Sequence, residues 1–575
     1  MIKLFLMQII WFLLLVGFFC IEIQMFVKSV FIFLVGCFGL VFIFNKRHFN
    51  QNIFINFSLL IVNLFLILQF IFCWNFNVYP YLYIVSFFIL YKLICLLFPF
   101  KIINNQSVFF CYSFLGIISL EILIILFFND IKLFQFYLNG SIFSIIIAAQ
   151  LLLIIPYLDS KEYSTNKNWN KIFKVTFILF CYAILFITKG RAGILGFTFG
   201  IFVYNFKYLK SKISLIKALI IILCLMFALF KFKSDSSSGR LLIYKVLITE
   251  LKPRELILGI GYGKFRIKYN HLQSHYFSTR SINSNDALFA DNGYFLYNDL
   301  FQLIIETGLL GLIIIVFGIF KFVILFRTRY LNFHKNKFEF GAYLSCIVLL
   351  VSSLFSYPFQ IFPIVIHFLF CITILLYYNK NTKDKTIQEP NNKLSNIIFI
   401  LSSLCLIYYS IGTFIFYIKS NQAIIYSKRG FRQKTLKLYQ NLSYGYIKDA
   451  RMLYNYALEL EKVKKIDKVI STLNESSAYL YNDQIEIVRA RLLVQKHLYY
   501  EAEKHFKKAI FINPKLFKNR ELLFNFYYDT KQYTKALECG NLILKLKVKV
   551  PSKSVARIRK SIFIKTTVIK KGSLN

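Results

Sequence analysis

Two arginines stand where a fixed positive charge could bind an anionic group. Arg191 lies between two apolar stretches in Thr188-Lys-Gly-Arg-Ala-Gly193, and an arginine at a membrane boundary is costly unless it reaches water or a ligand. Arg240 follows Ser236-Ser-Ser-Gly239 and opens a helix-like run that carries Lys245. The serine and glycine residues can cap this helix, whose free amide groups and dipole favour a phosphate. We expect an anion site at these basic residues. An interface anchor and an exposed basic helix face are the open alternatives.

A second group of polar residues stands where the chain enters a new apolar stretch. The group comprises Asp291, Asn292, Tyr297, Asn298, Asp299, Gln302 and Glu306. On a helix that starts near residue 295, Asn298, Gln302 and Glu306 are spaced by four and share one face. Polar groups at the mouth of a span normally face a cavity or another helix rather than lipid. The stripe therefore predicts a functional surface, with a hydrogen-bonded seam between helices as the open alternative.

Metal ligands and nucleotide loops are weakly indicated. His271 and His275 stand four apart, and Asp286 or Asp291 could add a ligand, but nothing fixes the geometry of a zinc site. None of the 11 Cys forms a CxxC pair, so we predict neither a disulfide framework nor a bound metal. The run Gly259-Ile-Gly-Tyr-Gly263 lacks the spacing of a nucleotide-binding loop, and we expect a tight turn there.

The composition indicates that membrane-embedded segments position these residues. The chain has 575 residues, of which 57% are hydrophobic and 19% aromatic, so a bilayer must solvate much of it. The net charge is +42, but most Lys and Arg lie in short loops between apolar runs, as in oriented membrane proteins. We therefore expect no nucleic-acid partner. The basic residues near the C-terminus leave contact with acidic lipid headgroups or acidic glycans open.

About thirteen apolar stretches are long enough and uncharged enough to predict transmembrane helices. They cover roughly 4–25, 29–44, 54–74, 81–99, 107–128, 141–158, 172–188, 192–206, 213–232, 295–325, 340–356, 359–378 and 395–418. The first of them is better explained as a transmembrane helix than as a signal peptide, because no small-residue cleavage site follows and further spans do.

The basic loops alternate along the chain and therefore set its orientation. They are Lys46-Arg47, Lys101, Lys161 to Lys171, Lys207 to Lys212, Arg327 to Lys337 and Lys380 to Lys393. Placing them in the cytoplasm puts the N-terminus there as well. The 233–294 loop, the turn at Arg191 and everything after residue 419 then face the outside, which in a bacterium is the periplasm.

The tail at 420–575 has helical periodicity and repeats near every 34 residues. Tyr499-Tyr-Glu-Ala and Tyr533-Thr-Lys-Ala start similar units, and weaker copies begin near Phe431 and Ile466. Small residues at fixed helix positions and Asn513-Pro514 at a repeat end are typical of tetratricopeptide repeats, which bind partners. A plain helical bundle is the alternative. The sequence thus predicts an all-α protein: a polytopic membrane bundle at 1–419 and a periplasmic repeat domain at 420–575.

The order of these features resembles the bacterial O-antigen ligase/polymerase superfamily, membrane glycosyltransferases of the GT-C type. Arg191 follows a span and Arg240 opens the large loop; LILGIGYGKF at 256–265 and FADNGYFLYNDLFQLIIETGLLG at 289–311 come next. The resemblance covers roughly residues 170–330. The tail, including Lys547-Val-Lys-Val-Pro-Ser552, is similar to that of a subgroup with tetratricopeptide repeats.

The resemblance implies transfer of a glycan from undecaprenyl pyrophosphate at the periplasmic face, without metal or other cofactor. The acceptor would be another glycan, lipid A-core or a protein hydroxyl. It implies that Arg191 and Arg240, with Lys245 nearby, hold the pyrophosphate, whose charge guanidinium groups neutralise well. The acceptor would then meet the loop residues His271, His275, Asn292, Asn298 and Gln302.

One position departs from the family pattern. In ligases of the family a histidine precedes the asparagine that corresponds to Asn298 and is proposed to activate the acceptor, whereas this chain has Tyr297. A neutral tyrosine is a poor general base at pH 7. The base is then Asp299, Glu306, Asp291 or a loop histidine, or stabilisation of the leaving group is enough.

Several functions remain open at this point. Within the family, polymerase and ligase are alternatives, as is a protein O-oligosaccharyltransferase. A flippase or transporter of lipid-linked glycans is the alternative from another class. It is disfavoured because the predicted spans hold few charges (Glu22, Lys92 and Glu121) and show no internal symmetry. A bilayer and a protein partner of the tail complete the expected partners.

Overall fold

The computed structural model describes part of the chain. The described residues are 140–156, 167–188, 190–206, 234–280, 285–333, 337–361, 393–445, 447–548 and 551–572, with 216, 220 and short pieces of 364–375. The spans predicted at 4–25, 29–44, 54–74, 81–99 and 107–128 lie outside these residues, as do most of 213–232 and part of 359–378.

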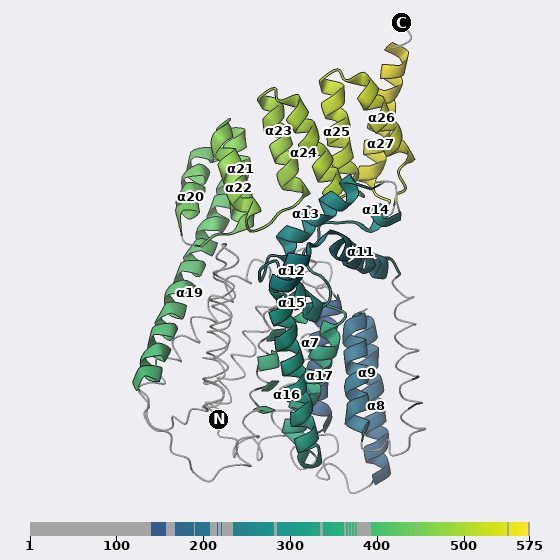
Figure 1. Cartoon of the computed structure of the whole chain (residues 1–575), viewed down its shortest axis with the longest axis vertical. Coiled ribbons are helices and arrows are strands. Elements are labelled where there is room, and N and C mark those ends of the chain that lie inside the picture. The colour runs from purple at the N-terminus through teal and green to yellow at the C-terminus, as the bar shows by residue number, and fades with distance from the viewer. Residues whose placement is uncertain are drawn as a thin grey trace. The chain divides into compact units, whose positions relative to one another are not determined.

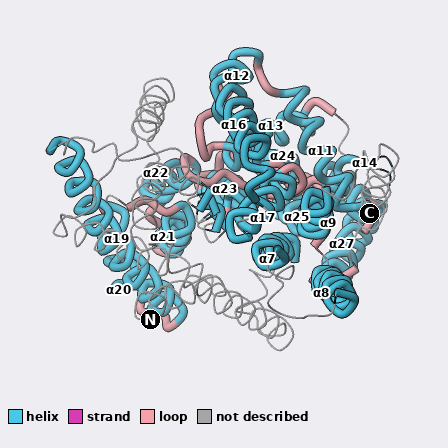
Figure 2. The backbone as a smooth tube through the Cα atoms, turned by 90° about the horizontal axis from the view of Figure 1, so that it is seen from below, coloured by secondary structure: helices cyan, strands magenta, loops and turns pink. Residues whose placement is uncertain are grey.

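The described elements are helices, and no strand occurs among them (Figure 2), which confirms the all-α prediction for this part of the chain. Over the same residues, no helix combines the length and the apolar composition that a membrane crossing requires. The backbone divides into two compact units, Met1–Phe232 with Tyr297–Tyr417, and Lys233–Leu296 with Ile418–Asn575.

Three helices form the described centre of the first unit (Figure 1). They are α7 (Gly140–Ile154), α9 (Arg191–Asn205) and α17 (Lys337–Ser353), and each packs against the other two. The helix α8 (Lys167–Ile187) lies against α7 and α9. These helices coincide with the predicted apolar stretches 141–158, 172–188, 192–206 and 340–356 to within a few residues.

Glycines allow this close packing. A side chain at Gly193 of α9 would place its Cβ 2.4 Å from the backbone carbon of Ser144 on α7. A Cβ at Gly341 of α17 would lie 2.2 Å from the carbonyl oxygen of Leu153. Small residues let helix backbones approach each other where apolar burial alone does not drive association. The small residues after Arg191 thus allow the start of α9 to pack closely against α7.

The prediction of one continuous helix over 295–325 is wrong. Two helices cover this region, α15 (Asp299–Thr307) and α16 (Leu309–Phe333), and Gly308 separates them with a φ of 67°. Glycine adopts this left-handed conformation without steric cost, which ends the first helix. Asn298 begins α15 by accepting a hydrogen bond from the backbone N–H of Phe301 at 3.0 Å.

In the second unit, the large predicted loop folds together with the tail. The loop forms α11 (Ser234–Glu250), α12 (Pro253–Leu258), α13 (Phe265–Ser278) and α14 (Asn285–Phe289). Within this unit, α13 packs against α11 on one side and against α24 (Tyr499–Ile512) of the tail on the other. Gly259, Gly261 and Gly263 all have positive φ, which confirms the tight turn between α12 and α13.

The predicted start of the helix at Arg240 is wrong. The helix α11 already begins at Ser234, so Ser236 to Gly239 lie inside it and do not cap it. Serine and glycine are weak helix formers, but packing overrides such local preferences. Ser237 is buried here, together with Leu242 and Val246 further along the helix. Arg240 therefore lies in the second turn of α11, away from the free amide groups of the helix start.

The tail consists of successive helix pairs. The end of α19 (Lys393–Lys428) precedes α20 (Arg432–Tyr444), and residue 420 lies within α19. The pairs continue with α21 (Ala450–Lys462), α22 (Ile466–Ser477), α23 (Asp483–Gln495), α24, α25 (Phe517–Asp529), α26 (Tyr533–Lys545) and α27 (Lys553–Gly572). Four of these helices begin at or beside the repeat starts predicted at Phe431, Ile466, Tyr499 and Tyr533.

The same turn precedes each of these four helices. Gly430, Lys464, His497 and Lys531 have φ values of 80°, 57°, 59° and 58°, and each lies two residues before a helix start. The residue after each one donates its N–H five positions back, as from Lys465 to Leu460 at 3.2 Å and from Leu498 to Leu493 at 2.9 Å. This is the Schellman arrangement at a helix end. The period seen in the sequence is thus a period of backbone conformation.

Candidate functional site

The first candidate residue, Arg191, begins α9. Gly190 is the N-cap residue of that helix, and the four residues that follow Arg191 are buried. The hydroxyl of Ser352 on α17 donates to the carbonyl oxygen of Ala192 at 3.0 Å, which fixes the first turn. The start of a helix carries free N–H groups and a partial positive charge. The guanidinium thus lies at a rigid helix start that suits an anion.

The polar stripe on α15 forms two separate contacts. Gln302 donates from Nε2 to Oε1 of Glu306 at 3.1 Å, and both side chains are buried. Asp299, also buried, accepts hydrogen bonds from the backbone N–H of Phe359 at 2.7 Å and from Nε2 of Gln360 at 3.5 Å. Phe359 and Gln360 belong to the short helix η4 (Pro358–Gln360). Asp299 thus ties the start of α15 to the turn after α17.

Two further residues of this stripe have other roles. The side chain of Asn298 caps α15, so its amide oxygen binds the start of the helix. Tyr297, at the position of the family histidine, has a φ of 60° and packs its ring edge-on against Tyr357 at 5.4 Å. A bulky residue in the left-handed region is strained, and such strain often occurs at functional sites.

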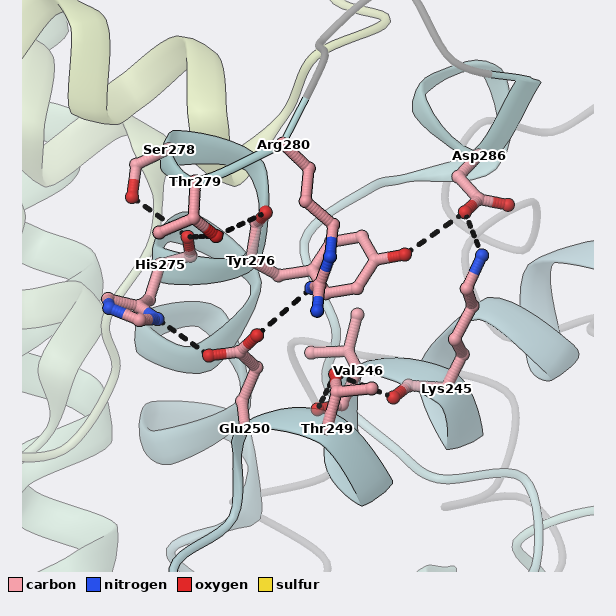
Figure 3. Close-up of polar contacts among 10 residues, drawn as sticks. All are labelled: Lys245, Val246, Thr249, Glu250, His275, Tyr276, Ser278, Thr279, Arg280 and Asp286. Atoms are coloured by element: carbon pink, nitrogen blue, oxygen red, sulfur yellow. Dashed lines mark hydrogen bonds and ion pairs between the residues drawn. The ribbon is translucent and has the colours of Figure 1, made fainter.

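The basic residues of α11 lie in the second unit. Lys245 is half exposed and forms an ion pair with Asp286 of α14 at 2.6 Å (Figure 3). The hydroxyl of Tyr276 donates to the same carboxylate oxygen at 3.1 Å. The hydrogen bond to Asp286 raises the pKa of Lys245 above its usual value. Lys245 therefore stabilises the contact between α11 and α14, while Arg240 lies one and a half turns earlier on the same helix.

Glu250, at the end of α11, contacts a histidine of α13 and an arginine that follows that helix (Figure 3). Nδ1 of His275 lies 2.6 Å from its Oε2, and Nη1 of Arg280 lies 3.1 Å from its Oε1. The guanidinium of Arg280 also lies over the ring of Tyr276, 4.1 Å from the centroid. His275 thus has a structural partner, and no three His, Cys, Asp or Glu side chains converge as metal ligands within the described residues.

The closing segment of the loop, residues 291–296, is bound by the tail. Asp291 accepts a hydrogen bond from Nδ2 of Asn513 at 3.1 Å and forms an ion pair with Lys515 at 2.5 Å. Nδ2 of Asn292 donates to Oδ1 of Asp483 at 2.9 Å. These two candidate residues thus contact the repeat helices in the structure.

The helix α13 completes this contact, which we call the loop–repeat seam: Asn270, Gln273, Asp291, Asn292, Tyr481, Asp483, Ile512, Asn513, Lys515 and Asn519. The buried amide of Asn270 accepts from the N–H of Gly293 at 2.8 Å and donates to the carbonyl of Tyr481 at 2.7 Å. The buried amide of Gln273 donates to the carbonyls of Asp291 at 2.9 Å and Ile512 at 2.5 Å. Each amide therefore joins the closing segment to the tail.

His271 lies beside the seam. Its ring stacks on Tyr481 with 3.6 Å between the centroids. Desolvation of the ring and the charge of Lys508 lower the pKa of His271 to about 4. His271 and His275 are on one helix but contact different partners, so the structure does not bring them together.

The sequence pattern missed the residues on the tail side of this seam. Asp483 is buried and also accepts from Nδ2 of Asn519 at 2.8 Å. Such partners lie about 190 to 240 positions from the loop, as for Asn270 with Tyr481 and Gln273 with Ile512. The only local signal was the pair of amides one turn apart on α13, at positions 270 and 273.

Comparison with known proteins adds a family to this geometry. Residues 175–316 match the sequence profile of a family described as O-antigen ligase. The matched segment runs from α8 into α16 and includes Arg191, Arg240, Tyr297 and Asp299. A search of curated protein sequences finds no match to the chain. The segment 175–316 is thus similar to the O-antigen ligase family.

Proposed function

We propose that this protein is a glycosyltransferase of the bacterial inner membrane that moves a glycan from undecaprenyl pyrophosphate to an acceptor hydroxyl at the periplasmic face. The observation that carries the proposal is the O-antigen ligase match over 175–316, which spans both candidate arginines. In this proposal the first unit is the membrane bundle of about thirteen helices. The loop, the tetratricopeptide-like tail and the C-terminus face the periplasm, and the N-terminus faces the cytoplasm.

The reaction joins the acceptor oxygen to the anomeric carbon of the glycan and breaks the bond from that carbon to the pyrophosphate. The acceptor hydroxyl loses its proton, and undecaprenyl pyrophosphate leaves with additional negative charge. Guanidinium groups stabilise such charge through paired hydrogen bonds. We assign this role to Arg191 and Arg240. The rigid start of α9 supports Arg191, because a fixed charge needs no reorganisation during the reaction.

Lys245 is a weaker candidate for the pyrophosphate because its ammonium group is paired with Asp286. We propose that it positions α11, and with it Arg240. The ion pair thus gives the half-exposed Lys245 a structural role in the contact between α11 and α14.

The three carboxylates considered as general bases all have hydrogen-bond partners in the structure. Asp291 is paired with Lys515 and Asn513 in the seam, which favours a positioning role for it. Asp299 receives the backbone N–H of Phe359, and Glu306 receives the amide of Gln302. We propose that stabilisation of the leaving group contributes most to the rate and that Asp299 orients the strained Tyr297 next to it. A substituted Asp299 then slows transfer by less than a substituted Arg191.

The acceptor is identified by deleting the gene and analysing surface polysaccharide and glycoproteins of the bacterium. Loss of long chains with single repeat units retained identifies a polymerase, and bare lipid A-core identifies a ligase. Unchanged lipopolysaccharide with lost glycoprotein signal identifies protein O-glycosylation. Unchanged profiles in all these fractions contradict the proposed function, and unflipped donor on the cytoplasmic face points to a flippase instead.

A further inference from the structure

A pocket of about 600 Å³ lies inside the repeat domain, and none of its lining residues belongs to the loop–repeat seam. Its lining comes from the end of α19 and from α20, α21 and α23. The volume lies within the range of about 300 to 1,000 Å³ that small-molecule sites occupy. The residues that carry the argument are Ser427, Lys428, Tyr439, Asn455, Glu459 and Arg491.

A buried carboxylate lines this pocket. Glu459 is only 6% exposed, and its Oε1 accepts both the hydroxyl of Ser427 at 2.7 Å and the ammonium of Lys462 at 2.6 Å. Within the described residues its second oxygen, Oε2, accepts no hydrogen bond, although the side chain borders the cavity. Each oxygen of an ionised carboxylate can accept hydrogen bonds, and an ionised carboxylate donates none. Glu459 therefore presents an acceptor that a ligand hydroxyl can satisfy.

The rest of the lining supplies further donors and acceptors. Nε and Nη2 of Arg491 bind Glu461 at 3.0 and 2.8 Å, which neutralises that carboxylate and fixes the guanidinium. Tyr439 is hydrogen-bonded to Asn455. Lys428 forms no ion pair with another described residue, so one positive charge of the lining is uncompensated. The pocket thus mixes hydroxyl-binding groups with an excess cation.

We propose that this pocket binds a saccharide, as a subsite for a short stretch of glycan in the periplasmic repeat domain. Sugar hydroxyls both donate and accept, which matches a carboxylate oxygen, amides and an ammonium group in one cavity. The lining residues all lie between 424 and 495, so the pocket does not continue along the later repeats as a groove for an extended peptide would. The inference rests on the proposed function, because the saccharide is a segment of the glycan that the protein transfers.

The test measures direct binding to the full-length protein in detergent. The probe is a set of oligosaccharides released by mild acid from the surface polysaccharide of the bacterium that makes the protein, followed by saturation-transfer NMR. The wild type should bind, Glu459→Gln should bind about ten-fold more weakly, and Leu458→Trp, which narrows the cavity, should bind at least about ten-fold more weakly. The matched control Glu501→Gln changes an exposed carboxylate outside the pocket and should bind like the wild type.

Three results overturn the proposal. The first is the absence of oligosaccharide binding by the wild type. The second is equal binding by Leu458→Trp and the wild type when both have the same melting temperature. The third is binding of a mixed-sequence peptide pool at this pocket with no oligosaccharide bound. Saccharide binding by a protein that supports no transfer in cells would refute the proposed transferase and leave this binding site in place. Glycan transfer in cells without saccharide binding at the pocket would refute the binding site and leave the proposed transferase in place.

Discussion

Asn292 and Asp483 are separated by 191 positions in the sequence, yet Nδ2 of Asn292 donates to Oδ1 of Asp483 at 2.9 Å. This contact joins the end of the predicted catalytic loop to the repeat domain. The backbone N–H of Asp483 returns a weaker contact to Oδ1 of Asn292 at 3.4 Å. The repeat domain therefore packs against the loop and stabilises its closing segment. This structural role is additional to any role in binding a partner.

Removing Asp483 should release the closing segment. Asp483→Ala leaves the amides of Asn292 and Asn519 without their acceptor, which should destabilise the second unit by about 2 to 3 kcal/mol. Hydrogen exchange in the full-length protein should show faster exchange of α13 and of residues 291–296. Asp467→Ala, at a side chain that is 94% exposed, is the control and should change neither. Equal exchange in both variants would contradict the role of the seam.

Acid should loosen the same seam through His271. The folded pKa of about 4 lies below the ordinary value of 6.5, so the unfolded chain takes up the proton first as pH falls. The free energy of unfolding that neutral His271 contributes to the second unit is therefore complete above pH 6.5 and is lost as pH falls through 4. Because the ring is partly exposed, we expect this contribution to be about 1 kcal/mol. Exchange of α13, corrected for intrinsic rates, should be faster at pH 5 than at pH 7. His271→Phe keeps the ring but cannot titrate, and it should abolish the difference.

The left-handed residues before the repeat helices give a stability prediction. The first of these turns has glycine, Gly430, at the left-handed position, whereas the other three have a side chain there. Glycine relieves the steric cost of this conformation in the variants Lys464→Gly, His497→Gly and Lys531→Gly. Each should raise the stability of the second unit by about 0.5 kcal/mol, after the added flexibility of the unfolded chain is subtracted. Thermal unfolding measures this. The neighbouring change Lys465→Gly, at a residue with a φ of −85°, should be destabilising, and a gain there would refute the explanation.

Close packing at the start of α9 predicts a contrast between two glycines. Gly193→Ala forces a Cβ to within 2.4 Å of Ser144 backbone and should destabilise the first unit by about 1 to 3 kcal/mol. Gly318→Ala on α16 has no described atom within 4 Å of the new Cβ and should be neutral or slightly stabilising. Melting temperatures of the purified variants in detergent test this, and equal temperatures would contradict it.

Local sequence patterns predicted the described helices well where a repeat period or the residue types of one segment determined them. The repeat starts, the glycine turn at 259–263 and the helix around Arg191 follow from spacing and residue type. Two boundaries were predicted wrongly, because Gly308 interrupts an apolar run and because packing extends α11 through serines. The seam could not be predicted, since its hydrogen bonds join loop and tail residues that no local period relates.

The same reason limits prediction of the candidate site. The types of Asp291, Asn292 and His271 suggested chemistry, yet their partners Lys515, Asp483 and Tyr481 give them structural contacts. Burial and partner choice are properties of the folded chain, so residue type alone cannot separate a catalytic carboxylate from one that joins two elements.

The central claim is that Arg191 and Arg240 stabilise the pyrophosphate that leaves during glycan transfer. The most direct measurement complements a deletion strain with each variant and quantifies undecaprenyl-pyrophosphate-linked glycan by mass spectrometry, together with surface glycan. Arg191→Ala and Arg240→Ala should each lower transfer at least about 100-fold and cause the lipid-linked donor to accumulate. Arg254→Ala, at an exposed arginine of α12, should restore the wild-type pattern. Full restoration of surface glycan by Arg191→Ala and Arg240→Ala, at wild-type protein levels in the membrane, would contradict the claim.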